Sequence, residues 1–133
     1  MTGRFWLTVG WAALAVGLAG CGQEPVSYSA NVRPILAHSC GNCHNRTGEG
    51  LQASGFSVAT YDDVMKGTRF GQVVIAGSSE SSNLFRVIAG KVAPEIRMPP
   101  HHDSSHAEGR GQPLSADQVD TIQRWIDEGA KNN

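Results

Sequence analysis

The sequence predicts a small all-α domain of about four helices, and two of these helices are marked clearly. In residues 115–128, Ser115 with Gln118 three positions later forms a capping box, and the apolar residues that follow recur at helical spacing. A first helix is expected over residues 29–40, because Pro34 then falls in the first turn, where its missing N–H costs little. No alternation of strands and helices runs through the chain, which argues against an α/β fold.

The middle of the chain is expected to hold shorter elements. In order they are a polar, Gly-rich loop at 45–54, a helix at 61–66, a brief extended run at 73–75 and a helix at 78–89. Thr60 can cap the helix at 61–66, and Gly67 ends it. Ser78 and Ser79 offer caps for the helix that follows.

Size and charge limit the possible functions. The chain has 133 residues, enough for one small domain, and its 11 basic and 12 acidic residues are spread along it. No Lys/Arg cluster exists, so the sequence predicts no nucleic-acid surface.

The N-terminus has the features of an export signal. Residues 5–19 are almost all apolar or small, and this stretch is shorter than the roughly 20 residues of a membrane-spanning helix. The four residues that end at Cys21, Leu-Ala-Gly-Cys, resemble the lipobox of bacterial lipoproteins, which implies that Cys21 is lipidated. A plain signal peptide, or a short anchor helix with an incidental cysteine, is the alternative.

The lipoprotein interpretation gives the chain three parts. They are a signal peptide at 1–20, a lipidated tether at 21–28 and a folded domain at 29–131. It places the protein in the bacterial cell envelope, facing the periplasm. Gly22 gives no evident inner-membrane retention signal, which favours the outer membrane.

Residues 40–44 carry the pattern C-x-x-C-H, which is the attachment motif of c-type haem. The spacing has a chemical reason, because a two-residue gap lets one helical turn present both sulfurs to one edge of the porphyrin. Cys40 and Cys43 are therefore predicted to bind one haem covalently, and His44 to bind its iron. A thioredoxin-like site would need a strand–helix context, and a zinc site would need a second ligand pair, and the sequence offers neither.

The second axial ligand decides what a haem protein does. A methionine there raises the potential and gives an electron carrier. Met98 stands beside two prolines on a stiff, extended segment, which suits it to hold a sulfur against a metal. Met65 falls within the helix expected at 61–66, where a core position is the better interpretation.

Histidines could take the place of methionine. His101 and His102 follow Met98 closely, so a haem with two histidine ligands stays open, whereas His38 is expected along the first helix. His101, His102 and His106, with acidic residues nearby, could also bind a divalent metal. A solvated loop is the simpler interpretation of that segment.

Several short blocks resemble one family in their order along the chain. Around the haem motif these blocks are VRPIL at 32–36, TYDDV at 60–64, SNL at 82–84, RMPP at 97–100 and WIxxGA at 125–130. They resemble the planctomycete-type cytochrome c domain, over about residues 27–130. The resemblance implies a class I cytochrome c-like fold of about four helices around one covalent haem c, with His44 and Met98 as ligands.

The resemblance also implies a function. We expect an electron carrier and not an enzyme, tethered to a membrane through Cys21 and exchanging electrons with redox partner proteins of the cell envelope. A haem sensor or peroxidase-like protein with a labile sixth ligand is one alternative. A metal-binding lipoprotein that uses the histidines at 101–106 is another.

Two departures from that family stand out. Many class I cytochromes have a proline soon after the haem histidine that helps to orient the imidazole, but here none follows His44 until Pro94, so the sequence names no hydrogen-bond acceptor for the ring. The segment 101–113 is also longer than expected.

Overall fold

Five α-helices and two short helical turns of other types make up the part of the chain that the computed structural model describes, residues 23–100 and 112–133. They are a π-helical turn η1 (Tyr28–Val32), α1 (Arg33–Ser39), α2 (Glu49–Ser54), α3 (Tyr61–Lys66), α4 (Asn83–Ile88), a 3-10 turn η2 (Pro94–Ile96) and α5 (Ala116–Asp127). These residues form no strand, and an isolated bridge pairs Thr68 with Gly71. The all-α prediction is confirmed.

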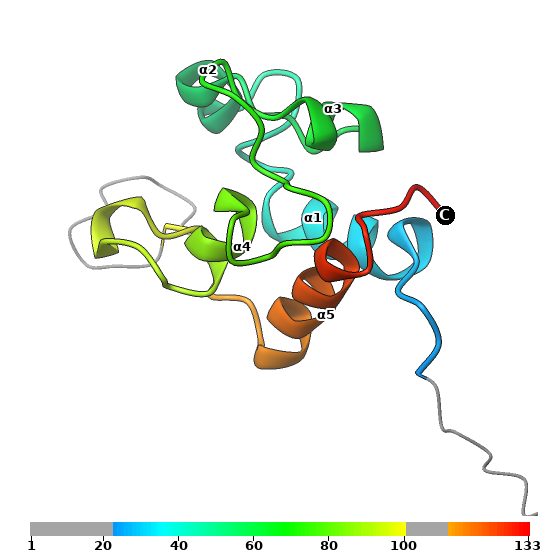
Figure 1. Cartoon of the computed structure of the whole chain (residues 1–133). Coiled ribbons are helices and arrows are strands. Elements are labelled where there is room, and N and C mark those ends of the chain that lie inside the picture. The colour runs from blue at the N-terminus through cyan, green and yellow to red at the C-terminus, as the bar shows by residue number, and fades with distance from the viewer. Residues whose placement is uncertain (1–22, 101–111) are drawn as a thin grey trace, which may run out of the picture.

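Four of the elements, η1, α1, α4 and α5, pack together and are called the base here. α5 contacts both η1 and α4, and η1 leads directly into α1 (Figure 1). Among the described residues, the largest fully buried side chains are apolar with the exception of Ser82. Most come from the base, and α3 adds Val64 and the loop before α4 adds Val74. Trp125, Ile122 and Ile126 give α5 the apolar face that its sequence predicts.

The helices α2 and α3 form a second part, the α2–α3 lobe, which Figure 1 shows at the end of the molecule away from α5. Arg69, after α3, ties the two helices together, because its main-chain N–H and its guanidinium donate to main-chain oxygens at the end of α2. The lobe joins the base through Tyr61. Its ring meets those of Tyr28 and Trp125 edge-on, with centroids 5.1 and 6.4 Å apart, and its hydroxyl donates to the Ala130 carbonyl at 2.8 Å.

The predictions for the first and last helices agree well with the structure. The capping box of α5 is complete, with Gln118 N–H donating to Ser115 Oγ at 3.2 Å and Ser115 N–H donating to Gln118 Oε1 at 2.9 Å. Pro34 lies in the first turn of α1, and η1 extends the helical run back to Tyr28. The short helix at 61–66 is confirmed with its Thr60 cap.

Two predictions for the middle of the chain are wrong. The expected loop at 45–54 contains α2, which ends where Gly55 adopts a positive φ of 76°. The helix expected at 78–89 begins only at Asn83, because Ser79 does not cap it. Instead the main-chain N–H and the hydroxyl of Ser79 both donate to the Asp127 carboxylate on α5, at 2.8 and 3.0 Å.

The N-terminal segment and Cys21 lie outside the described residues, as do His101, His102 and His106. Within the two described ranges, no helix has the length and apolar character needed to cross a bilayer.

Candidate functional site

The five residues of the C-x-x-C-H motif form one helical turn directly after α1. Cys40 N–H donates to the Leu36 carbonyl at 2.9 Å, which continues the hydrogen bonding of α1. The N–H groups of Cys43 and His44 then both donate to the Cys40 carbonyl, at 3.2 and 2.8 Å. The structure therefore brings these three predicted site residues together on one turn, as the spacing of the motif requires.

The two thiols of the motif differ in their surroundings. Neither Cys40 nor Cys43 forms a disulfide in the structure. Cys40 packs against the hydrophobic core, while Cys43 is exposed. Burial, with a smaller contribution from the neighbouring Cys43, raises the pKa of the Cys40 thiol from its ordinary 9.0 to about 11. Cys40 is thus the inner thiol of the pair and stays protonated at neutral pH.

The imidazole of His44 is held by a residue that the sequence did not reveal. Nδ1 lies 3.1 Å from the main-chain carbonyl of Phe56. A carbonyl only accepts hydrogen bonds, so Nδ1 carries the proton and donates it, which leaves the lone pair on Nε2. Nε2 has no hydrogen-bond partner among the described residues, so it is available to a metal.

The chain reaches Phe56 by turning back after α2. Leu51 N–H donates to the Cys43 carbonyl at 3.0 Å, and Val58 N–H donates to the His44 carbonyl at 2.9 Å. The Phe56 ring, which is almost fully buried, meets the imidazole edge-on at a centroid distance of 5.3 Å. The segment after α2 therefore runs against His44 and fixes both its main chain and its ring. No proline near the motif takes part in this arrangement.

Met98 lies on a separate segment, after η2. Its N–H donates to the Val87 carbonyl at 3.1 Å, which fastens it to the end of α4, and its side chain is half-buried. The following Met98–Pro99 peptide bond is cis, and Pro99 is buried. Met98 is predicted to lie on a stiff, extended segment. The preceding residue, Arg97, has an extended backbone, which agrees with that prediction.

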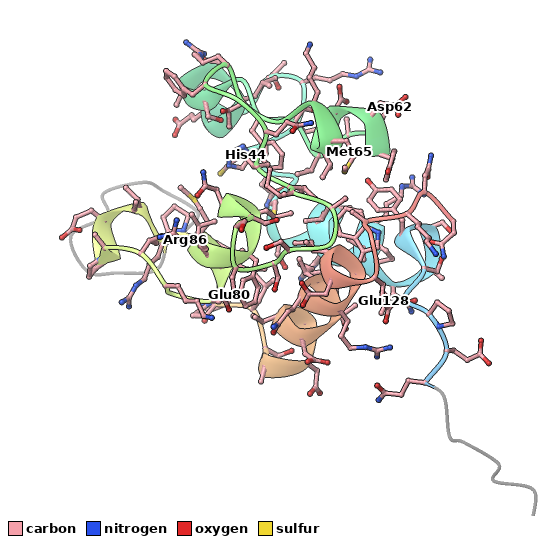
Figure 2. All side chains as sticks on the ribbon, viewed as in Figure 1. His44, Asp62, Met65, Glu80, Arg86 and Glu128 are labelled. Carbon is pink, nitrogen blue, oxygen red and sulfur yellow. The ribbon has the colours of Figure 1, made fainter. Side chains whose placement is uncertain are left out.

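The other candidate ligands fall into two groups. Met65 packs against the core from the side of α3 that faces the base, and Figure 2 shows it in the same part of the molecule as His44. His38 is exposed in the last turn of α1. The histidines of 101–106 lie outside the described residues, and within the described ranges no group of three or more potential metal-binding side chains comes together.

The motif turn, with two unpaired thiols and an imidazole that offers Nε2, has the donor set of a haem c site. Residues 40–102 match the family described as Planctomycete cytochrome C, a segment that begins at the motif and includes Met98. Residues 40–102 are therefore the matched part of a planctomycete-type cytochrome c domain. The match covers a little under half of the sequence.

The match supports a haem c protein, with electron transfer as the activity of such a domain. A search of curated proteins and a search of solved structures found no match to the chain.

Proposed function

We propose that this protein is a mono-haem c-type cytochrome that carries single electrons in the bacterial cell envelope, held to a membrane by a lipid on Cys21. It acts as an electron carrier between redox partner proteins and not as an enzyme. The observation that supports this most strongly is the motif turn, where the Phe56 carbonyl already holds the imidazole of His44 with Nε2 available.

Cys40 and Cys43 are the proposed attachment points. On haem binding, each thiol would add across one vinyl group of the porphyrin: the S–H bond would break, an S–C bond would form and the hydrogen would go to the other vinyl carbon. The addition needs no oxidant, and its two sulfurs come from one helical turn. Because Cys40 is the inner thiol and Cys43 the outer one, the attached edge would lie where the core meets the surface.

His44 and Met98 are the proposed iron ligands. A bound haem supplies an iron that alternates between its ferric and ferrous states, and a thioether ligand favours the reduced state. The protein contributes an imidazole fixed through Phe56 and a methionine fastened to α4 by its own N–H. Both contacts would limit movement of the two ligands during a change in the charge of the iron.

The proposed lipid on Cys21 would hold the folded domain close to the membrane, because the chain is fixed to the domain from Glu24 onward. The Glu24 carbonyl accepts from Arg124 at 3.1 Å, and Val26 N–H donates to the Glu128 carboxylate at 2.7 Å. Only Gly22 and Gln23 separate Cys21 from Glu24, so these positions are at most about 10 Å apart. A lipid on Cys21 would therefore hold the C-terminal end of α5, which Glu128 follows, next to the membrane.

The test is to produce the full chain in a host that attaches c-type haem, and then to combine a haem-stained gel with an intact mass. We expect one covalent haem, loss of residues 1–20 and a lipid on the new N-terminal Cys21. Replacing Cys21 by serine should release the protein from membranes and leave the haem in place. A colourless protein with both motif thiols free would overturn the proposal.

A further inference from the structure

Gly50, the second residue of α2, lies against the imidazole of His44. A Cβ added to Gly50 would stand 2.7 Å from Cε1, 2.8 Å from Nε2 and 2.9 Å from Nδ1 of that ring. Such distances are far shorter than carbon contacts in proteins. The position therefore has no room for any side chain while the ring keeps its orientation.

The three distances also define which side of the ring α2 covers. An atom in the ring plane beyond Cε1 would be much closer to Cε1 than to either nitrogen. The nearly equal values place the missing Cβ over the face of the ring. The Nε2 lone pair points within the ring plane, so α2 restrains the ring and leaves this lone pair accessible.

The backbone conformation does not explain the glycine. Gly50 is absent from the glycines with positive φ, so another residue could adopt its conformation. A glycine inside a helix costs about 1 kcal/mol relative to alanine. In a six-residue helix this cost is substantial, and the contact with His44 is the reason that the structure offers for it.

The helix cannot easily move away from the ring. At its first turn, Leu51 N–H donates to the Cys43 carbonyl at 3.0 Å, and a Cβ on Gly48 would collide with that same carbonyl. At its other end, Arg69 N–H donates to the Ser54 carbonyl at 2.9 Å. A side chain at position 50 would therefore displace the imidazole, because α2 is fastened at both ends.

We propose that Gly50 is a positioning residue for His44: its missing side chain lets α2 cover one face of the imidazole while the Phe56 carbonyl holds the ring at Nδ1. This inference rests on the proposed role of His44 as an iron ligand. Together the two contacts fix the orientation of the imidazole, and they would thereby set its rotation about a bond from Nε2 to a haem iron. Gly50 touches the ligand and does not itself bind the haem.

The test is Gly50→Ala in the full-length haem-loaded protein. We expect covalent haem to be retained, the electron paramagnetic resonance g-values of the oxidised form to shift, and the His44 Nδ1 proton to exchange with water about tenfold faster, as its bond to Phe56 weakens. Ala53→Gly, at an exposed position of α2, is the matched control, because it lowers helix propensity and should leave both signals unchanged.

Native g-values and native proton exchange in Gly50→Ala would overturn the inference and leave the proposed function intact. A wild-type protein without covalent haem would overturn both. If the variant does not fold, nuclear magnetic resonance of the reduced wild-type protein decides: we expect a strong cross-peak between the Gly50 α-protons and the ring proton on His44 Cε1. Absence of that cross-peak would overturn the inference.

Discussion

The different surroundings of the two motif thiols lead to a quantitative prediction about their reactivity before haem attachment. Only the thiolate reacts with iodoacetamide, and a pKa of about 11 in place of 9.0 lowers the thiolate fraction of Cys40 about a hundredfold near pH 8. A thiolate of higher pKa is intrinsically more nucleophilic, which offsets roughly eightfold of this effect at a Brønsted slope of about 0.45. We expect folded, haem-free protein to alkylate at Cys40 at least tenfold more slowly than at Cys43.

The assay is peptide mapping by mass spectrometry after timed alkylation of reduced, haem-free protein, with Cys21 replaced by serine so that two thiols remain. The same reaction in urea is the control, where the two rates should become equal. Equal rates in protein that circular dichroism shows to be folded would refute the assignment of Cys40 as the inner thiol.

The same burial makes the stability of this haem-free form depend on pH. The folded state holds Cys40 as a neutral thiol with a raised pKa, so the unfolded state loses its proton first as the pH rises. This contribution to stability is complete below about pH 9 and is lost progressively up to about pH 11. Urea unfolding measured across that range should show the decline, and Cys40→Ala should reduce it.

Four further substitutions test individual contacts in the domain. Tyr61→Phe removes the hydrogen bond to the Ala130 carbonyl and should lower the free energy of unfolding by about 1 kcal/mol. Tyr28→Phe removes a buried hydroxyl that has no partner among the described residues. It should leave the free energy of unfolding unchanged or raise it. Ser115→Ala breaks the capping box and should cost about 1 kcal/mol in urea unfolding without altering the haem spectrum. Met98→Ala should abolish the weak red absorption band of a methionine–iron bond and let the reduced protein bind carbon monoxide rapidly; an unchanged spectrum would exclude Met98 as the ligand.

The elements that sequence analysis predicted well are those determined by local signals. The capping box of α5 lies within four residues, and the Thr60 cap and Gly67 stop of α3 enclose a single short helix. The C-x-x-C-H turn is equally local, since its hydrogen bonds converge on the Cys40 carbonyl. In each case the residues that fix the conformation are next to one another in the chain.

The elements that were missed depend on contacts with residues outside their own segment. The serines before α4 looked like helix caps, but Ser79 donates both its groups to Asp127, which lies 48 positions later. The glycines around α2 indicated a loop, yet Gly50 lies inside the helix, against the imidazole of His44. The sequence alone does not distinguish a glycine that makes room for a tertiary contact from a glycine that breaks a helix.

The acceptor for the His44 ring illustrates the same limit and also shows why the site is well built. Phe56 O accepts from Nδ1 and Val58 N–H donates to the His44 carbonyl, so one three-residue segment bonds both the side chain and the main chain of the ligand. That segment is also the connection between α2 and α3. The contact that orients the imidazole is therefore one of the contacts that attach the α2–α3 lobe to the motif turn. A change that breaks the Phe56 or Val58 contact should then alter the iron ligand before it unfolds the base.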